Sequence, residues 1–312
     1  MILITGSNGV LGEAFKKLNN DFFFLDGKKK LDLRDYKSVD SFFDDKKFDG
    51  IIHLAAVSGG IGLSGNKFQA TLLRDNILML INILDIAVKK KINKVLTTLS
   101  SGMYPPNAKM PYNEESIHDG PAHESSYGYF YAKRFFEPAI RSYREQFGID
   151  IIGCVPNGIF GENDNFSEQS TMLPSIINRM YFAKKNNEEL KVWGDGSALR
   201  EYTYSGDLAK ALMWCYKNYS SEKILNVGSN EEVSIKNIVY FIADAMKFDK
   251  KNIIFDGIKN AAVFRKTMDN SKFLNLSKFE FLSLKEGIKK AVDWFLMSIE
   301  KDSNFIKNYK KV

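Results

Sequence analysis

Tyr129 and Lys133 lie four residues apart in a stretch with helical periodicity, so their side chains share one face of the predicted helix. A free phenol has a pKa of about 10 and exchanges protons poorly near neutrality. A neighbouring ammonium stabilises the phenolate and lowers that pKa, which suits a residue that passes a proton to a carbonyl oxygen. Ser100 ends a predicted strand and offers a hydroxyl that can donate to the same oxygen. We therefore predict that Ser100, Tyr129 and Lys133 are catalytic.

A glycine-rich turn, Thr5-Gly-Ser-Asn-Gly-Val-Leu-Gly12, separates a predicted strand from a predicted helix. Gly6 permits the tight turn, Gly9 lets the backbone approach a diphosphate, and Gly12 allows the helix to pack on the strand. This pattern predicts a bound dinucleotide, the alternative being a purely structural turn. The residues assigned to the cofactor are Gly6, Ser7, Asn8, Gly9, Val10, Leu11, Lys28, Asp32, Leu33, Leu54, Ala55, Ala56, Asn76, Tyr129, Lys133 and Pro156.

The residues after the second strand leave the choice of cofactor open. Asp26 lies about 20 residues beyond the first glycine, where an acid that binds the adenosine ribose favours NAD. Lys28, Lys29 and Lys30 follow at once, and their charges suit the 2′-phosphate of NADP, although lysines are also common in solvated turns. Asp32 and Leu33 are expected to line the adenine pocket.

Strand and helix patterns alternate through the first half of the chain, which predicts an α/β fold with a doubly wound parallel sheet of the Rossmann type. The strands are predicted at 2–5, 22–25, 50–56, 94–100 and 151–155, and the helices at about 11–18, 68–90 and 125–147. After Asn157 the loops lengthen, and Ser234 is expected to cap a helix that ends near Met246. We predict a dinucleotide-binding domain over 1–160 plus about 201–230. A second, smaller α/β substrate lobe is predicted over about 161–200 and 231–312.

Composition narrows the function classes. The 312 residues carry a net charge of +6, two cysteines and three histidines. Buried thiols in a cytoplasmic protein are expected, and no metal site. No apolar run reaches the roughly 18 residues that span a bilayer, and Met1 leads directly into a strand pattern, so no membrane partner and no secretion leader are expected. The lysine clusters lie at predicted element ends, which favours a small anionic substrate over nucleic acid.

Several segments resemble the GDP-L-fucose synthase family. The general ones are Thr5–Gly12, His53–Ala56, Leu99–Pro105 and Tyr129–Lys133, and the more specific ones are His118–Pro121, Phe160–Phe166, Val192–Gly196 and Arg200–Tyr204. The similarity runs from residue 1 to about 295, where Ala291–Phe295 closes it. The resemblance implies an NADPH-dependent oxidoreductase that epimerises C3 and C5 of a GDP-4-keto-sugar and then reduces C4. It tips the cofactor prediction to NADP, with NAD as the alternative.

Two departures from the family bear on epimerisation. The family uses a cysteine two residues after the catalytic serine and a histidine three residues before a proline. Gly102 and Thr171 stand there in this chain, with Pro174 marking the second position. A glycine cannot exchange a proton and a threonine hydroxyl is a very weak base. We therefore expect a C4-reductase without epimerase activity, with a full GDP-L-fucose synthase as the alternative.

The resemblance also implies a substrate site. It assigns Ser101, Gly102, Asn157, Asn165, Arg179, Trp193 and Arg200 to the substrate, with the two arginines at its diphosphate. The family's Pro-Thr-Asn is Pro156-Asn157-Gly158 here, and Lys259–Ala262 lacks the family's acid. These changes point to a GDP-4-keto-heptose or a GDP-4-keto-6-deoxy-sugar of capsule or surface polysaccharide synthesis.

Three alternatives stay open at this stage, besides a 4,6-dehydratase, which Ser101-Gly102 disfavours because such enzymes carry an Asp-Glu pair there. One is an NAD-dependent GDP-heptose 4-dehydrogenase, which runs the reaction in reverse. Another is a binding protein that senses the dinucleotide. The last is the full synthase named above. A homodimer through the two long helices is implied by the resemblance alone.

Overall fold

The computed structural model describes residues 1–58, 68–167, 170–257, 264–302 and 305–308. Its centre is a six-stranded parallel sheet in the order β10-β5-β4-β3-β1-β2. The strands are β1 (Ile2–Thr5), β2 (Phe22–Leu25), β3 (Gly50–His53), β4 (Lys94–Thr98), β5 (Asp150–Pro156) and β10 (Leu225–Val227). Strand order reverses between β1 and β3, and ligands bind at such a switch point in doubly wound folds. The predicted fold class is confirmed.

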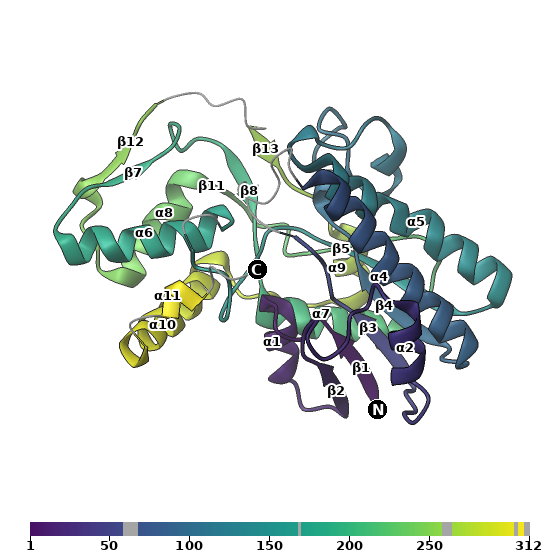
Figure 1. Cartoon of the computed structure of the whole chain (residues 1–312). Helices are drawn as coiled ribbons and strands as arrows, with labels where there is room; N and C mark the ends of the chain where they lie inside the picture. Colours follow the sequence, from purple (N-terminus) through teal and green to yellow (C-terminus); the bar gives the residue numbers. More distant parts are fainter. Residues whose placement is uncertain (59–67, 168–169, 258–263, 303–304, 309–312) are drawn as a thin grey trace.

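Helices cover both faces of this sheet (Figure 1). One face carries α2 (Tyr36–Phe42), α4 (Gln69–Lys89) and α5 (Tyr127–Phe147), and the other carries α1 (Val10–Lys16) and α7 (Ser205–Asn218). Successive strand residues point to opposite faces and both sides are buried, so the strands are almost wholly apolar. Leu3, Ile51, Val95 and Ile151 belong to the first core cluster, and Ile4, Ile52, Leu96 and Ile152 to the second.

Two strands end earlier than the sequence predicted. The third stops at His53 rather than Ala56, and the fourth at Thr98 rather than Ser100. After His53 the backbone leaves the ladder, because the Asn76 side chain takes both the amide and the carbonyl of Val57. The chain segments that follow these strands therefore lie free at the carboxyl edge of the sheet, where a ligand can reach them.

A smaller lobe packs around its own core and lies at the left of Figure 1. Its helices are α6 (Met172–Asn186), α8 (Ile235–Met246), α10 (Leu284–Lys301) and α11 (Phe305–Asn308). Short strands join them, namely β6 (Ile159–Phe160), β7 (Leu190–Val192), β8 (Leu199–Glu201), β9 (Thr203–Tyr204), β11 (Glu232–Ser234), β12 (Ile253–Phe255) and β13 (Arg265–Lys266). Ser234 accepts a hydrogen bond from the amide of Asn237, which confirms the predicted cap. The domain boundaries stay a prediction.

Both cysteines are buried free thiols, as predicted, Cys154 on β5 and Cys215 on α7. They lie in the same core cluster between the sheet and α7, and burial raises the pKa of the Cys154 thiol. Across the described ranges, no helix is both long enough and apolar enough to cross a membrane.

Candidate active site

Ser100, Tyr129 and Lys133 meet at the carboxyl end of β4. Ser100 caps the short helix η1 (Ser101–Met103), where its oxygen accepts from the amide of Gly102 at 3.4 Å. Tyr129 and Lys133 lie one turn apart on α5, which crosses above this strand end. The ammonium of Lys133 lies 5.9 Å from the centre of the Tyr129 ring. The structure thus brings together the three residues that were predicted to be catalytic.

Lys133 is buried to 1 % exposure, which is unusual for a lysine. Its ammonium donates a 2.7 Å hydrogen bond to the carbonyl oxygen of Thr98, the last residue of β4. Burial disfavours the charged form and lowers the pKa of Lys133 to about 7. The amine therefore stands near its midpoint at neutral pH, fixed to the end of the strand beside the serine turn.

The pKa of Tyr129 differs from the sequence-based expectation. Burial raises it to about 12, and only a hydrogen bond from Ser100 acts in the opposite direction. The expected lowering by Lys133 is not found, because that ammonium is turned toward the Thr98 carbonyl rather than the phenol oxygen. A phenol with this pKa keeps its proton at neutral pH, which is the state that a proton donor needs.

The glycine-rich turn has the geometry of a dinucleotide cradle. Gly6 has a φ of +69°, and a Cβ there would lie 2.6 Å from the amide nitrogen of Ala55. A Cβ at Gly12 would lie 2.4 Å from the Gly6 carbonyl oxygen, so this helix start packs too closely for any side chain. At Gly9 a Cβ would meet only the Gly6 oxygen, at 3.5 Å. The absence of a side chain at Gly9 therefore leaves open space, and a diphosphate fits there.

The acid at the end of β2 is already paired. Asp26 accepts hydrogen bonds from Ser7 at 2.8 Å and from Lys30 at 2.8 Å, and Lys30 is the first cause of its lowered pKa. Ser7 is thus used to fix this strand end. Lys28 is 69 % exposed and lies 3.8 Å from Asp32. The cations around Asp26 neutralise it, which favours the 2′-phosphate of NADP over a ribose hydroxyl.

Asp32 and Leu33 have structural contacts of their own. Asp32 binds Arg34 through two oxygens, at 2.8 and 2.6 Å, and this pairing lowers its pKa to about 2. Arg34 also pairs with the buried Asp75. The Leu33 side chain is 6 % exposed and belongs to the core. Only the Asp32 carboxylate, about a third exposed, reaches the surface of the expected adenine pocket.

The other residues assigned to the cofactor surround the same edge of the sheet. Leu54, Ala55 and Ala56 follow β3, and the Ala55 amide donates to the Thr5 hydroxyl at 3.3 Å. Asn76 is buried and holds the Val57 backbone, so it orders this segment. Val10 and Leu11 begin α1, with Leu11 in the core, and Asn8 accepts from Lys16 at 3.3 Å. Pro156 is buried at the end of β5.

Two of the predicted substrate residues join the serine turn to the smaller lobe. Ser101 donates a 2.6 Å hydrogen bond to Oδ1 of Asn157, and both side chains are buried. Asn157 in turn donates to the backbone carbonyl of Lys266 at 3.4 Å. The asparagine that the family resemblance showed displaced by one residue thus links the serine turn, the loop after β5 and strand β13.

Gly102 lies against the ring of Phe130. A Cβ at Gly102 would fall 1.9 Å from Cε1 and 2.3 Å from Cζ of that ring. Phe130 follows Tyr129 on α5, and Lys266 lies 5.9 Å from the centre of its ring. A side chain at residue 102 therefore requires the Phe130 ring to leave its place.

The two predicted diphosphate arginines have different neighbours. Arg179 donates to the Lys191 carbonyl, and its guanidinium lies 5.9 Å from the ring of Trp193, which is 65 % exposed. Arg200 on β8 pairs in register with Lys266 on β13. Burial, then the Arg200 charge, lowers the pKa of Lys266 to about 8. Within the described chain neither Arg200 nor Lys266 has an acidic partner, which suits an anion between them.

The remaining predicted positions lie in the loop before α6. Asn165 is exposed and accepts from the Ser167 amide at 3.0 Å, so its side chain shapes the loop. Thr171 is exposed at the start of α6 and makes no side-chain cap. The loop Lys259–Ala262 lies outside the described residues, apart from which the acid that the family carries has no described counterpart to examine.

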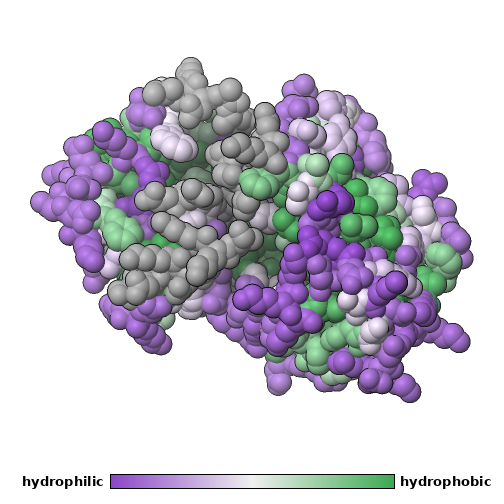
Figure 2. Space-filling model, viewed as in Figure 1, coloured by the Kyte–Doolittle hydropathy of each residue, from purple (hydrophilic) through white to green (hydrophobic). Residues whose placement is uncertain are grey.

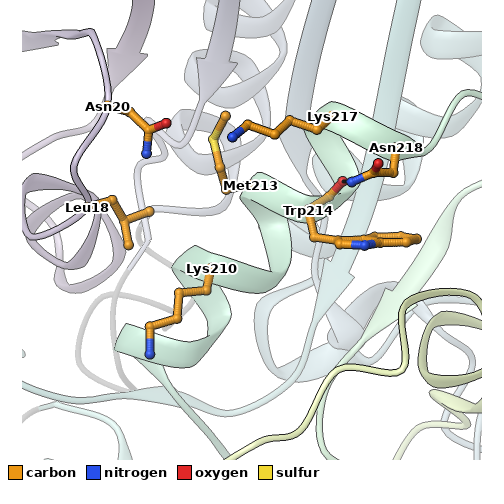
Figure 3. Close-up of a pocket in the computed structure, with 7 residues that line it drawn as sticks. All are labelled: Leu18, Asn20, Lys210, Met213, Trp214, Lys217 and Asn218. Atoms are coloured by element: carbon orange, nitrogen blue, oxygen red, sulfur yellow. Dashed lines mark hydrogen bonds between the residues drawn. The ribbon is translucent and has the colours of Figure 1, made fainter.

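One surface pocket lies apart from these residues. It has a volume of about 300 Å³ and is lined by Leu18 and Asn20 after α1 and by five residues of α7 (Figure 3). Those five are Lys210, Met213, Trp214, Lys217 and Asn218. None of its lining residues belongs to the predicted site, and Asn218 is engaged by the Trp214 carbonyl. The pocket adds nothing to the site at the carboxyl edge.

Sequence reasoning missed three residues of this site. Phe130 and Lys266 carried no signal, because their relation to Gly102 and Arg200 arises only from packing between distant segments. Arg134 is the third. It is buried, and it donates to the carbonyl oxygens of Met103 and Gly120, which ties α5 to the serine turn. Its place next to Lys133 was the only available clue.

Comparisons with known proteins agree with this geometry. The NAD dependent epimerase/dehydratase family model matches residues 2–228. A GDP-L-fucose synthase of Dictyostelium discoideum is 34% identical over 309 residues, which cover 96% of each chain. The crystal structure of a GDP-L-fucose synthetase from Naegleria fowleri bound to NADP has a TM-score of 0.88 at 32% identity, over 96% of this chain and 94% of that one. A GDP-mannoheptose C4 reductase from Campylobacter jejuni shares the fold, with a TM-score of 0.83 at 24% identity over 95% and 98% of the two chains.

Proposed function

The chain belongs to the NAD dependent epimerase/dehydratase family and, within it, to the GDP-L-fucose synthase family. From that premise we propose that it reduces the C4 keto group of a GDP-4-keto-sugar with NADPH and does not epimerise C3 or C5. The proposal is carried by one observation. The reducing residues meet at the end of β4, while the Phe130 ring fills the space that a base at residue 102 needs.

The reduction follows from the protonation states of the site. NADPH supplies a hydride to the carbonyl carbon when it is bound beside α5. The Tyr129 phenol, which burial keeps protonated, donates its proton to the oxygen that becomes the new hydroxyl. Ser100 donates a second hydrogen bond and so stabilises the charge that develops on that oxygen. Lys133, fixed by the Thr98 carbonyl, holds the cofactor ribose and supplies positive charge near the phenol.

Epimerisation needs a base and an acid on opposite sides of the sugar ring. The family resemblance places these at residues 102 and 171. Gly102 has no side chain, and the space in front of it is taken by Phe130. Thr171 offers only an exposed hydroxyl. Both half-reactions of an epimerase therefore lack a group that could perform them.

NADP is the cofactor that the relatives and the cradle support together. The Naegleria fowleri structure carries NADP by its title, and the lysines beside Asp26 leave an excess of positive charge at the expected 2′-phosphate. Asp26 is bound to Ser7 and Lys30. It is therefore poorly placed to accept from the ribose hydroxyls of NAD, which weakens the dehydrogenase alternative.

The sugar itself is proposed from the site's departures rather than from its neighbours. The Asn157 link and the bare Gly102 and Gly158 change the sugar end relative to the family pattern. We propose a GDP-4-keto-heptose or a GDP-4-keto-6-deoxy-sugar, made for capsule or surface polysaccharide in the cytoplasm. The homodimer is proposed through α4 and α5, whose exposed apolar residues include Leu78, Tyr131 and Phe135.

The test is turnover in deuterated water. Purified protein is mixed with NADPH and a panel of GDP-4-keto-sugars, with and without a separate C3/C5 epimerase. We expect NADPH oxidation and products that carry no solvent deuterium at C3 or C5 unless the epimerase is present. Rapid exchange by this protein alone would make it a full synthase. Tightly bound NADH together with oxidation of a GDP-heptose would make it a dehydrogenase.

A further inference from the structure

The ring of Phe130 stands between the catalytic tyrosine and the smaller lobe. It lies next to Tyr129 on α5, with ring centres 5.6 Å apart. His123 meets its edge, with ring centres 6.5 Å apart and planes at 87°. The ammonium of Lys266 lies 5.9 Å from its centre. The ring is half-buried, so part of it faces the space between these groups.

The same ring sets the conformation that residue 102 can have. A Cβ on Gly102 would overlap three ring atoms, Cδ1, Cε1 and Cζ, at 1.9 to 2.4 Å. Real Cβ atoms do not approach other atoms so closely, so even an alanine at 102 displaces the ring. Tyr129 and His123 adjoin the ring in its present place. Residues 102 and 130 are thus coupled by volume, although 28 positions separate them in the sequence shown.

We propose that Phe130 is the specificity-determining residue at the sugar end of the site. It forms an apolar wall against which the sugar ring lies, and it keeps residue 102 from carrying a side chain. This inference rests on the proposed function. An aromatic face suits the C–H face of a sugar, and Lys266 and His123 at its border can donate to hydroxyl groups. Lys266 has no acidic partner within the described chain, so its ammonium is available for this.

The steric part is tested without substrate by a double-mutant cycle. Gly102→Ala alone should lower the melting temperature by a few degrees, because an overpacked site costs about 1–3 kcal/mol. In the Phe130→Ala background the same change should cost little or nothing. Gly102→Ala combined with Phe147→Ala is the matched control, since Phe147 lies on the same helix but is 47 % exposed. There the two shifts should add.

The substrate part is tested by kinetics. Phe130→Ala should raise KM for the GDP-4-keto-sugar about tenfold while KM for NADPH stays unchanged, because only the sugar loses a contact. Phe130→Leu, which keeps an apolar wall, should recover much of the loss.

Each outcome decides a different claim. Additive melting shifts for residues 102 and 130 would overturn the steric coupling. A coupled cycle with an unchanged sugar KM would overturn the wall. If the unmodified protein reduces no GDP-4-keto-sugar at all, the proposed function fails, while the thermal cycle still decides whether Phe130 controls residue 102.

Discussion

Lys133 donates a 2.7 Å hydrogen bond to the carbonyl oxygen of Thr98, and this bond fixes helix α5 to the end of strand β4. Tyr129 lies one turn earlier on the same helix, and Ser100 lies two residues beyond the strand end. One contact therefore sets the distance between the proton donor and the serine that assists it. The predictions below begin from this arrangement.

Tyr129→Phe should abolish turnover and leave cofactor binding intact. The substitution removes the only proton that the site can donate at the reacting oxygen, while the ring and its packing remain. We expect kcat to fall by about 10² to 10⁴, the usual contribution of a positioned acid. NADPH binding, followed by fluorescence, should change little. Activity that survives this change would show that another group donates the proton.

Lys133 should make folding stability depend on pH in one direction. Its pKa is about 7 in the folded chain and about 10.5 in the unfolded chain, so the unfolded chain binds more protons between these values. Stability from this group therefore rises as pH increases from about 7 to 10.5, and it is lowest below 7. Lys133→Met should remove this rise, which amounts to a few kcal/mol.

The measurement is the difference between the denaturation curves of the unmodified chain and of Lys133→Met across that pH range. Lys37→Met, at an exposed position, controls for the loss of a lysine as such. A difference curve that stays flat for Lys133→Met would mean that the amine is not desolvated in the folded protein.

The sequence predicted the sheet well because each strand is a continuous apolar run that is buried on both faces, and Leu3 and Ile4 illustrate the two. It placed the end of β3 three residues too late, because the Asn76 side chain, from a distant helix, takes the Val57 backbone. Local patterns do not record such a contact.

The catalytic set was predicted for a similar reason. Tyr129 and Lys133 share a helix face, and that relation is local. The contacts of Phe130 with Gly102 and of Ser101 with Asn157 join segments that are far apart in the chain, so no spacing rule announces them. The direction of the Tyr129 pKa was missed because burial, which raises it, is a property of the packed structure.

Arg134 should act as a positioning residue for the serine turn. Its guanidinium donates to the Met103 and Gly120 carbonyls, and within the described chain no carboxylate pairs with it. Arg134→Met removes these bonds and leaves the carbonyls unpaired. We expect kcat to fall about 10²-fold, since a small misplacement of Ser100 has that effect, with KM for NADPH unchanged.

A shift in the pH profile separates positioning from simple loss of stability. Ser100 lowers the pKa of Tyr129, so a displaced serine should move the alkaline limb of kcat/KM to higher pH. Arg141→Met, on the same helix and 63% exposed, should change neither quantity. If Arg134→Met loses only thermal stability, the residue has no positioning role.

The exposed apolar residues of α4 and α5 should form the interface of a dimer. Leu73 and Leu78 are each 38% exposed, and Tyr131 and Phe135 are 39% and 37% exposed on the neighbouring helix. Figure 2 shows apolar side chains gathered over these helices. Leu78→Glu with Phe135→Glu should convert a dimer to a monomer in sedimentation velocity, because it buries charge in the interface. An unmodified chain that sediments as a monomer would exclude this interface.

The cofactor preference should depend on Lys28. This ammonium is 69 % exposed near Asp32, whereas Lys30 is engaged by Asp26 at 2.8 Å. Lys28 is therefore the cation free to meet a 2′-phosphate. Lys28→Ala should raise KM for NADPH about tenfold, equivalent to 1.4 kcal/mol, and leave KM for NADH unchanged. The effect should shrink at high ionic strength, because an exposed pair is screened. Lys47→Ala, at another exposed position, is the control. Equal losses for both cofactors would mean that Lys28 does not contact the 2′-phosphate.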